Sequence, residues 1–410
     1  MNTKVLVVNA GSSSLKFSLY EMPGARELIN GNVEKIGLKD SFCSLKIDGK
    51  KIKHDFYVKD HGAAAEVMLK ELIDNHIINN LNEISSIGHR ILHGGEYFSE
   101  SVIIDNDVLN KITGLTKLGP LHHPGEIGAI KKMMELLPNT LNVAVFDTAF
   151  HQTMPKENYI YAVPYDWYLK NGVRKYGFHG TSHRYITSVM QSKLNKENVN
   201  IISCHLGGGA SIACIKDSKC LDTTMGLTPL DGLVMGTRSG SVDPSIITYM
   251  MQETGKTAEE IVSDLNKNSG LLGICGKSDF RDVETLINEK NENAILAFDK
   301  FRDSIVKYIA YYYVLLDGNV DAIVFTAGIG ENVISIRKSV IDKLSNSLGI
   351  KLNEKENSSI AKFKDKQEGL ITTNDSKIPA YVIPTNEELM ILNDTYNLVY
   401  NDSKKLSLKK

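Results

Sequence analysis

The chain has 410 residues, of which 42% are hydrophobic, and its 47 basic and 49 acidic residues leave a net charge of −2. This length allows two domains with sizeable cores. The balanced charge argues against a nucleic acid or an anionic membrane as partner, because either would need a concentrated basic surface. The five cysteines form no C-x-x-C pair, no apolar run is long enough to span a membrane, and the N-terminus passes directly into a predicted strand. We therefore expect a cytoplasmic protein with reduced thiols.

The first organised stretch, residues 4–20 (KVLVVNAGSSSLKFSLY), predicts two strands joined by a turn of small residues. Residues 5–8 form an apolar run, and residues 15–19 alternate between apolar and polar side chains, with Lys16 and Ser18 on a wet face. Backbone N–H groups in such a turn form a nest for anions, so Ser12, Ser14 and Lys16 are candidate phosphate ligands. An ordinary Gly/Ser hairpin is the alternative.

The pattern recurs twice. Residues 200–215 (NIISCHLGGGASIACI) again predict strand, glycine turn and strand, and residues 320–332 (VDAIVFTAGIGEN) predict a strand that ends in a glycine-rich turn. Neither a Walker loop nor a G-x-G-x-x-G after a strand is present. Three such turns favour a duplicated core whose loops converge on a polyphosphate.

Periodicity predicts the remaining elements in chain order. Strands are expected at 42–47, 51–58, 84–93, 141–146 and 380–383. Helices are expected at 62–78, 127–137, 244–253, 257–266, 293–316 and 337–348. Residues 176–185 are expected to continue as a helix through residue 194. Residues 385–388 are expected to cap a final helix that runs to about residue 399. Loops are expected at 118–126, 226–244 and 269–282, and the Lys-rich tail from residue 404 is expected to be solvated.

Several charged residues stand at predicted strand ends or in loops, where ligand sites are common. Arg90 ends one strand with His89 and His93, and a surface Arg in a turn is the alternative. Asp147 follows another strand as a candidate catalytic or magnesium-positioning carboxylate, or as a simple N-cap. Arg238 lies between small residues that would let it reach a phosphoryl group, or is an exposed structural Arg.

Two histidine pairs suggest metal sites at first sight. His122 and His123 have no further ligand at metal spacing, so a satisfied or substrate-facing histidine is favoured. His179 and His183 are four residues apart but lack an H-E-x-x-H signature. We expect one functional and one structural histidine in that pair.

Nine segments together resemble the acetate kinase family, within the superfamily of acetate and sugar kinases, Hsp70 and actin. They are VNAGSSSLKF, GHRILHGGE, VFDTAFH, YGFHGTSH, HLGGGASI, MGLTPLDGLVMGTRSG, SGLLGI, FTAGIGEN and PTNEEL. The resemblance covers almost the full length. It implies an α/β protein of two domains (1–147 with 387–410, and 148–386) with duplicated ribonuclease H-like, actin-like ATPase cores, ATP in the cleft between them, and a homodimer.

The implied reaction is the reversible transfer of a phosphoryl group from ATP to acetate, giving ADP and acetyl phosphate, with Mg²⁺ or Mn²⁺. A carboxylate is already ionised at neutral pH, so the nucleophile needs no general base. Phosphoryl transfer depends mainly on positioning and charge neutralisation, a demand that Arg90, His179 and Arg238 fit.

The resemblance assigns further roles by residue. Arg90 would hold the acetate carboxylate, Arg238 the transferring phosphoryl group, His179 transition-state charge, and Asp147 the Mg²⁺ or an Arg. Mg²⁺ would be placed by Asn9 and Glu387. The methyl group of acetate would be bound by Leu92, Leu121, Phe178 and Pro229, with His122 nearby. ATP would be bound by Ser12, Ser14, Lys16, His205, Leu206, Gly207, Gly208, Gly209, Asp279, Phe280, Arg281, Gly328, Ile329, Gly330, Glu331 and Asn332.

The chain departs from the family pattern at four places. Gly208 replaces an Asn in the phosphate loop, the loop before Asp279 is one residue short, His123 replaces an Asn, and Leu92 replaces a smaller Val. The bulkier Leu92 favours acetate over propionate. The alternatives are a propionate kinase, a pyrophosphate-using relative and, from another class, an actin- or Hsp70-like nucleotide-binding module.

Overall fold

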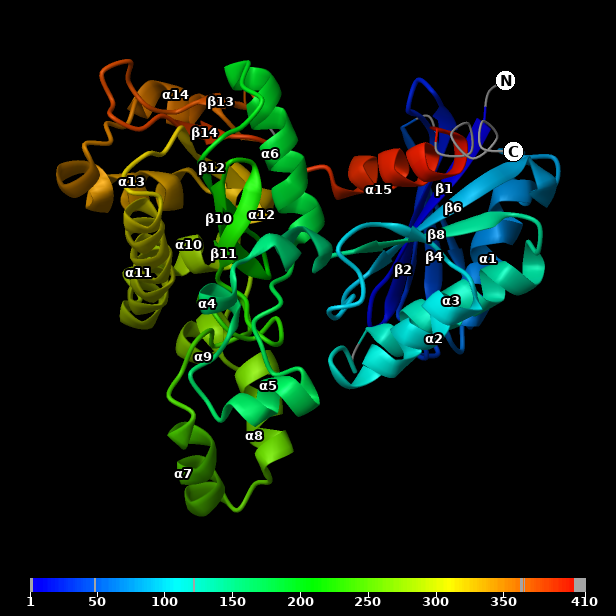
Figure 1. Ribbon diagram of the computed structural model, residues 1–410, viewed down its shortest axis with the longest axis horizontal. Coiled ribbons are helices and arrows are strands. Elements are labelled where there is room, and N and C mark those ends of the chain that lie inside the picture. The colour runs from blue at the N-terminus through cyan, green and yellow to red at the C-terminus, as the bar shows by residue number, and fades with distance from the viewer. Residues whose placement is uncertain (1–2, 48, 121, 362–363, 365, 402–410) are drawn as a thin grey trace. The chain divides into compact units, whose positions relative to one another are not determined.

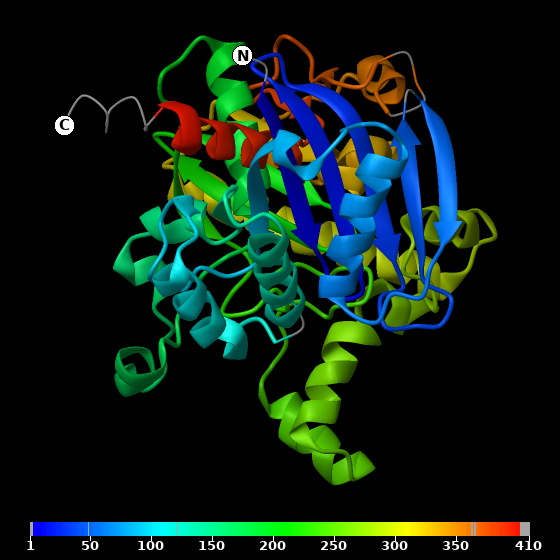
Figure 2. The ribbon, with the colours of Figure 1, turned by 90° about the vertical axis from the view of Figure 1, so that its right-hand side faces the viewer.

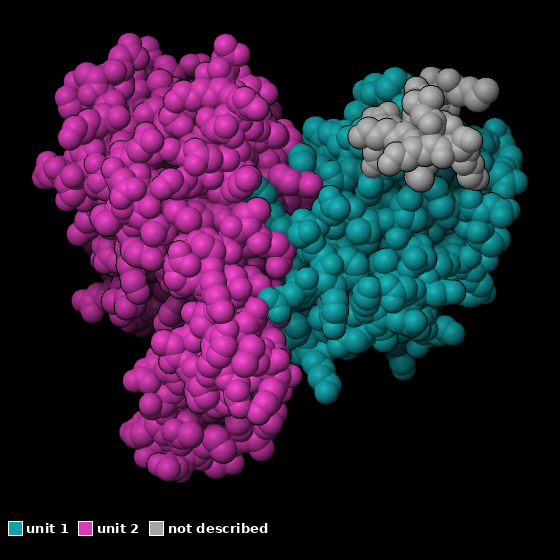
Figure 3. Space-filling model, viewed as in Figure 1, with its two compact units in different colours: residues 1–150, 386–410 teal, residues 151–385 magenta. Residues whose placement is uncertain are grey.

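The structure is a computed structural model that describes residues 3–401, apart from 48, 121, 362–363 and 365. The chain forms two compact units, one of residues 1–150 with 386–410 and one of residues 151–385 (Figure 3). We call them unit 1 and unit 2. The sequence predicts domains of residues 1–147 with 387–410 and of residues 148–386. These limits remain a prediction. The Lys-rich tail lies outside the described residues.

Unit 1 is built on one eight-stranded sheet in the order β5-β4-β3-β2-β1-β6-β8-β7 (Figures 1 and 2). Its strands are β1 (Thr3–Ala10), β2 (Ser14–Met22), β3 (Arg26–Glu34), β4 (Phe42–Ile47), β5 (Lys50–Asp55), β6 (Ile84–Ile91), β7 (Val102–Ile103) and β8 (Leu141–Phe146). Its helices are α1 (His61–Asp74), α2 (Asn106–Gly114), α3 (His123–Leu136) and α15 (Glu387–Tyr396), with short 3₁₀ turns at Leu81–Glu83 and Leu115–Lys117 and a π-helical turn at Asn397–Asn401. A further 3₁₀ turn, Ala149–Thr153, runs across the limit between the units.

Both faces of this sheet are covered, which explains why residues 5–8 of β1 form an unbroken apolar run. Leu6 and Val8 face a core that includes side chains of α1 and α3. Val5 and Val7 face the other way, onto a core that includes Leu392 of α15. Helix α15, which follows unit 2 in the sequence, therefore completes the core of the unit that contains β1 (Figure 1).

Unit 2 carries a six-stranded sheet in the order β11-β10-β9-β12-β14-β13. Its strands are β9 (Ile201–Leu206), β10 (Ala210–Lys216), β11 (Lys219–Thr223), β12 (Ala322–Thr326), β13 (Gly369–Leu370) and β14 (Ala380–Val382). Its helices are α4 (Lys156–Tyr159), α5 (Tyr165–Asn171), α6 (Gly180–Leu194), α7 (Ser245–Thr254), α8 (Ala258–Lys267), α9 (Gly270–Cys275), α10 (Phe280–Asn288), α11 (Glu292–Leu315), α12 (Ala327–Asn332), α13 (Ile334–Leu348) and α14 (Glu354–Ser359).

The two sheets repeat one topology. In unit 1, β1 pairs antiparallel with β2 and parallel with β6, and β6 pairs parallel with β8. In unit 2, β9 pairs antiparallel with β10 and parallel with β12, and β12 pairs parallel with β14. The duplicated core predicted from the recurring hairpins is therefore present.

The structure corrects some predicted elements. The predicted loop 269–282 contains α9 and the start of α10, and the GIGEN segment is the helix α12 instead of a turn. The carbonyls of Gly330 and Glu331 accept hydrogen bonds from the buried Arg337 guanidinium at 3.0 and 2.8 Å, which stabilises the end of this short helix.

Three corrections concern unit 1. Helix α3 begins at His123, four residues before the predicted start, because Pro124 is favourable in the first helical turn. Ser18 is not on a wet face: it is 1% exposed, and its hydroxyl donates to Glu388 of α15 at 2.8 Å. The predicted strand 51–58 ends at Asp55.

Among the described residues, no helix is long and apolar enough to cross a membrane. All five cysteines are free thiols, and four of them are buried.

Candidate functional site

The central ion pair of unit 1 lies where β6 and β8 end. Arg90 donates from Nε and Nη2 to the two carboxylate oxygens of Asp147, at 3.0 and 2.6 Å. Asp147 directly follows β8, the parallel neighbour of β6, so both side chains leave the same edge of the sheet. The Asp147 side chain is fully buried and that of Arg90 is 23% exposed. Bidentate pairing therefore fixes the guanidinium while part of it stays accessible.

Arg90 also has further acidic and polar neighbours. Its Nη1 lies 3.5 Å from Oδ1 of Asn9, its register partner on β1. Burial by itself would lower the pKa of Arg90, but Asp147, Glu387 and Glu126 outweigh that effect and raise the pKa above its ordinary value. A permanently charged, oriented guanidinium suits the binding of a carboxylate.

The predicted metal ligands, Asn9 and Glu387, both lie near Arg90. Glu387 opens α15, and its Oε1 is buried with no hydrogen-bond partner among the described residues. Burial raises the pKa of Glu387, although Arg90 opposes the shift. The part of the chain that the structure describes holds no group of three or more His, Cys, Asp or Glu at metal-binding positions. An amide oxygen and an orphaned carboxylate oxygen fit Mg²⁺, which takes one or two protein ligands and completes its shell with water and phosphate.

The first glycine turn is a tight hairpin. The Gly11 N–H donates to the Ser14 carbonyl at 2.8 Å, and His61 Nε2 donates to the Gly11 carbonyl at 2.7 Å. Ser12 lines a cavity of about 760 Å³, whereas Lys16 lines another, of about 430 Å³, beside Glu388. Ser12 and Lys16 therefore line two different cavities.

The residues predicted to bind the methyl group are divided between the units. Leu92, 9% exposed, lies in unit 1, and its N–H donates to Glu126 at 3.0 Å. Phe178 is buried in unit 2, where the Pro229 carbonyl accepts from Arg238 at 3.1 Å. His122 is the residue before α3 and is partly buried. Leu121 lies outside the described residues.

In unit 2 the glycine loop between β9 and β10 contacts two predicted catalytic residues. A Cβ added at Gly209 would lie 3.3 Å from Arg238 Nη1 and 3.6 Å from His179 Nε2. The loop is closed by the Gly207 N–H, which donates to the Gly209 carbonyl at 3.0 Å. The Gly236 N–H donates to the Gly208 carbonyl at 3.2 Å and joins the Arg238 segment to the loop. The structure thus brings the predicted phosphate loop, Arg238 and His179 together.

Arg238 has a different environment from Arg90. Its Nη1 contacts the Pro229 carbonyl and, at 3.7 Å, the Met235 sulfur, and no carboxylate pairs with it among the described residues. Burial lowers the pKa of Arg238 from its ordinary value. A partly buried cation without an acidic partner gains most from an anionic ligand.

His179 is held in an uncommon conformation. It precedes α6 with φ 57° and ψ 24°, in the left-handed region that non-glycine residues rarely adopt. Its ring stacks on His205, with centroids 4.1 Å apart, and its Nδ1 lies 2.9 Å from the Ser211 hydroxyl. His205 is buried, and its Nδ1 lies 2.8 Å from the Ser182 hydroxyl.

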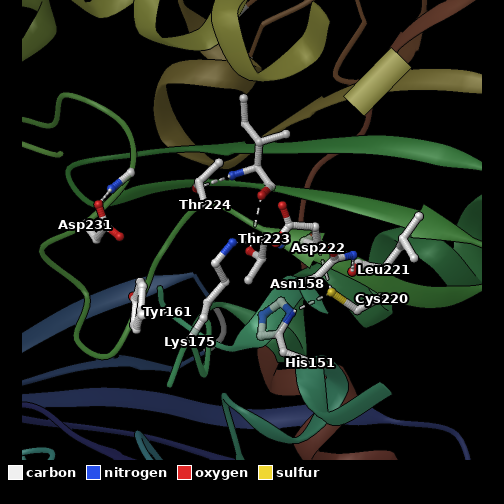
Figure 4. A network of polar contacts seen from close by, with 12 residues as sticks. His151, Asn158, Tyr161, Lys175, Cys220, Leu221, Asp222, Thr223, Thr224 and Asp231 are labelled. Atoms are coloured by element: carbon white, nitrogen blue, oxygen red, sulfur yellow. Dashed lines mark hydrogen bonds and ion pairs between the residues drawn. The ribbon is translucent and has the colours of Figure 1, made fainter. Parts of the chain in front are cut away.

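A buried polar network that includes residues of β11 holds the segment before His179 (Figure 4). Lys175 and Asp222 form an ion pair at 2.5 Å. His151 Nδ1 lies 3.1 Å from Cys220 Sγ, and its Nε2 donates at 2.9 Å to the carbonyl of the residue preceding His179. The segment that leads into α6 is therefore anchored to the sheet.

The remaining predicted nucleotide residues lie in two places. In α12, Gly328 is exposed, Ile329 and Gly330 are buried, and Asn332 donates from Nδ2 to the Gly328 carbonyl at 2.9 Å. Glu331 Oε1 accepts the Thr385 N–H at 3.1 Å. A Cβ at Gly330 would lie 3.7 Å from the Cβ of Leu206, so α12 packs against the end of β9.

The second place is the start of α10. Asp279 is the N-cap of this helix and pairs with Arg281 at 2.5 Å on an exposed surface. The hydrogen bond from Arg281 lowers the pKa of Asp279 to about 2. Phe280 is buried against Phe298 and Phe301, so it packs in the core.

Sequence reasoning missed the groups behind these residues: Ser203, Ser211 and Glu126. All three are buried, and each contacts a candidate residue or its neighbour. Two serines on adjacent antiparallel strands carry no signal in a single sequence, since the contact depends on the pairing of β9 with β10.

The two units repeat one topology, and each carries charged and polar side chains at its strand ends. These features define a two-domain α/β protein of the actin-like ATPase fold. The model of the Acetokinase family matches residues 4–393, and the chain belongs to that family.

Similar proteins agree with this assignment. The chain is 49% identical over 397 residues to the acetate kinase of Acholeplasma laidlawii, covering 96% of this chain and 99% of that one. It is 46% identical to the acetate kinase of Clostridium novyi, covering 98% of this chain and 100% of that one. Two crystal structures, an acetate kinase from Porphyromonas gingivalis and a propionate kinase from Francisella tularensis, are each 43% identical, with TM-scores of 0.91 and 0.90, and each covers 97% of this chain and 100% of its own.

Proposed function

We propose that this protein catalyses the reversible, Mg²⁺-dependent transfer of the γ-phosphoryl group of ATP to acetate, giving acetyl phosphate and ADP. One observation carries the proposal: Arg238, a partly buried arginine without a carboxylate partner among the described residues, lies with His179 against the glycine loop after β9. Membership of the Acetokinase family supports it, as do the relatives at 46–49% identity that are named acetate kinases.

In this reaction a carboxylate oxygen of acetate attacks the γ-phosphorus in line, and the bond from phosphorus to the ADP oxygen breaks. Arg90, oriented by Asp147, binds the acetate carboxylate. Arg238 and His179 neutralise charge on the γ-phosphoryl oxygens, which is the main contribution that a protein makes to phosphoryl transfer. The glycine loop after β9, α12 and the segment 279–281 bind the nucleotide.

Asn9 and Glu387 would hold Mg²⁺, with Mn²⁺ as a substitute, and the buried Glu387 Oε1 without a partner among the described residues supports this assignment. When bound, the cation neutralises phosphate charge. Asn9 contacts Arg90 directly, so the same residue would order the carboxylate-binding guanidinium.

The test measures acetyl phosphate formed by the purified protein with Mg-ATP and acetate, propionate, butyrate or no acid. We expect acetate-dependent product that is lost in Arg90→Ala. Arg302→Ala is the matched control, because Arg302 is also a mostly buried arginine paired with aspartate, on α11 in unit 2. Slow ATP hydrolysis that ignores every acid would instead support a nucleotide-binding module.

Propionate is the second candidate acceptor, because the propionate kinase from Francisella tularensis is as similar in structure as the acetate kinase from Porphyromonas gingivalis. A higher kcat/KM for propionate than for acetate would overturn the choice of acetate. Replacing ATP with pyrophosphate in the same assay tests the remaining alternative.

We also propose a cytoplasmic homodimer. Exposed apolar side chains on unit 2, such as Trp167 and Leu169 of α5 and Tyr249 of α7, support association. Sedimentation velocity at several protein concentrations tests it, and a single species of monomer mass would contradict it.

A further inference from the structure

A line of four side chains runs from the core of unit 2 to His179. Ser211 Oγ on β10 lies 2.9 Å from His179 Nδ1 and also 2.9 Å from His183 Nε2 on α6. The other ring nitrogen of His183, Nδ1, lies 2.9 Å from Ser203 Oγ on β9. The order along the line is therefore Ser203, His183, Ser211, His179.

His183 is uncharged in this setting. It is fully buried, and its pKa lies well below the ordinary value because of burial first and the neighbouring His151 and His205 second. A neutral imidazole has one N–H donor and one bare nitrogen that accepts. The two hydrogen bonds of His183 must therefore run in the same direction along the line.

The hydroxyl of Ser203 sets that direction. Ser203 is fully buried, and among the described residues His183 Nδ1 is the one partner of its side chain. A buried hydroxyl hydrogen without an acceptor is unfavourable, because the group has lost its hydrogen bonds to water and gained none in return. Ser203 therefore donates to His183 Nδ1, and His183 carries its hydrogen on Nε2.

The rest of the line follows from this step. His183 donates from Nε2 to Ser211 Oγ, and the single hydroxyl hydrogen of Ser211 then goes to His179 Nδ1. With Nδ1 as acceptor, His179 carries its hydrogen on Nε2, and this nitrogen would lie 3.6 Å from a Cβ added at Gly209, close to Arg238. The opposite direction would leave the Ser203 hydrogen without an acceptor in the described part of the chain.

We propose that Ser203, His183 and Ser211 hold His179 as the Nε2–H tautomer and so aim a hydrogen-bond donor at the transferring phosphoryl group. The inference rests on the proposed function for the phosphoryl ligand, but the tautomer is a property of the protein alone. The three residues are positioning residues, since only His179 would touch the substrate. The hydrogen bond that one ring nitrogen of a histidine makes determines whether the other nitrogen carries a hydrogen and can donate.

The direct test is the tautomer of His179 by long-range ¹H–¹⁵N correlation in full-length protein labelled with ¹⁵N-histidine, at a pH where His179 is neutral. His179→Gln assigns the signals. We expect Nε2–H in the wild type and a substantial Nδ1–H population in Ser203→Ala and Ser211→Ala, whereas Ser211→Thr, which keeps the hydroxyl, retains Nε2–H. A wild-type Nδ1–H tautomer, or an unchanged tautomer in both alanine variants, overturns the proposal.

The kinetic test uses Ser203→Ala with Thr187→Val as matched control. Thr187 is buried on α6, and its hydroxyl donates to the His183 carbonyl at 2.8 Å, so the control removes a neighbouring hydroxyl outside the line. We expect kcat to fall roughly 10- to 100-fold in Ser203→Ala, the usual effect of removing an orienting partner, with little change in KM. Equal kcat values in the two variants would overturn the inference.

The two tests also separate failure of this inference from failure of the proposed function. If the wild-type protein makes no acetyl phosphate, the proposed function fails, while the NMR measurement still decides the tautomer. Thermal unfolding of each variant checks that it is folded.

Discussion

Arg90 and Arg238 are chemically identical side chains with opposite surroundings. Arg90 is fixed by Asp147 and lies near Glu387, so its charge is largely compensated before any ligand binds. Arg238 contacts a carbonyl and a thioether and has no acidic partner among the described residues. The first arrangement favours precise orientation of a small carboxylate, and the second favours strong attraction of a polyanion.

Leu92 gives a prediction about acceptor size. Leu92→Val removes one methylene from a side chain that we propose contacts the methyl group of acetate. The ratio of kcat/KM for propionate over acetate should rise about 10-fold or more, since a methylene in such a pocket is worth about 1–3 kcal/mol. Steady-state kinetics with both acids measures it. Leu137→Val, another buried leucine of unit 1, is the control, and an unchanged ratio would remove Leu92 from the pocket.

Gly208 gives a prediction about the nucleotide. A Cβ at this position meets no atom within 4 Å, and its φ lies outside the left-handed region, so Gly208→Asn should fold without strain. The added amide donor should lower KM for ATP by about 2- to 10-fold, the value of one hydrogen bond. Gly24→Asn is the control because that site is equally open. A higher KM for ATP would contradict a phosphate-binding role for the loop.

At the scale of elements, Glu126 couples α3 to the end of β6. Its Oε1 accepts the Leu92 N–H at 3.0 Å, and its Oε2 lies 3.9 Å from His123 Nε2. Burial is the main reason that the pKa of Glu126 is raised to about 8, and the nearby Asp147 raises it further. The hydrogen bond from the Leu92 N–H and the charge of Arg90 lower this pKa, but they do not outweigh burial. The carboxyl is therefore mostly protonated in the folded protein at neutral pH.

This raised pKa makes stability depend on pH. In the unfolded chain Glu126 loses its proton near its ordinary pKa of 4.5, so its contribution to stability is complete below 4.5 and is lost as the pH rises towards 8. Glu126→Gln cannot titrate. The free energy of unfolding of the variant, relative to wild type, should therefore increase between pH 4.5 and 8, by roughly a few kcal/mol.

Urea unfolding of both proteins at several pH values without Mg²⁺ measures this difference. Exposed Glu100→Gln on the same unit is the control for loss of a surface carboxylate. Parallel stability curves for wild type and Glu126→Gln would contradict a protonated Glu126.

The elements that the sequence predicted well are those that one periodic pattern determines. The hairpin β1–β2 follows from alternation and a turn of small residues, and α6 follows from a periodic run that ends at Leu194. α12 was missed because two glycines in six residues predict a turn, and Arg337, which stabilises its carbonyls, comes from the next helix.

The contact of Arg90 with Asp147 could not be derived without the family resemblance, since it requires β6 and β8 to be neighbours. The line of hydrogen-bonded side chains from Ser203 to His179 depends in the same way on strand pairing.

At the scale of the whole molecule, unit 1 is discontinuous in sequence. Its sheet is made from the first 150 residues, but one face is covered by α15, which the chain reaches only after unit 2. The same helix carries Glu387, with its buried oxygen, and Glu388, which accepts hydrogen bonds from Ser18 and Tyr20 of β2. The stability of unit 1 and the position of the candidate metal ligand therefore depend on one C-terminal helix.

Leu392→Ala tests this dependence, because Leu392 is fully buried on α15 against the core of unit 1. The free energy of unfolding of unit 1 should fall by about 2–5 kcal/mol. Trp167, the single tryptophan, lies in unit 2 on α5, so its fluorescence follows unit 2, whereas far-UV circular dichroism follows both units. In urea, the dichroism of Leu392→Ala should begin to change before the fluorescence does.

The magnesium concentration for half-maximal activity should rise in the same variant, since Glu387 lies on the loosened helix. Val314→Ala, at an exposed position of unit 2, is the control and should leave both probes and the magnesium requirement unchanged. Coincident shifts of dichroism and fluorescence in Leu392→Ala would mean that the two units unfold together. In that case α15 would stabilise the whole chain, because losing its packing in unit 1 would lower the stability of unit 2 by the same amount.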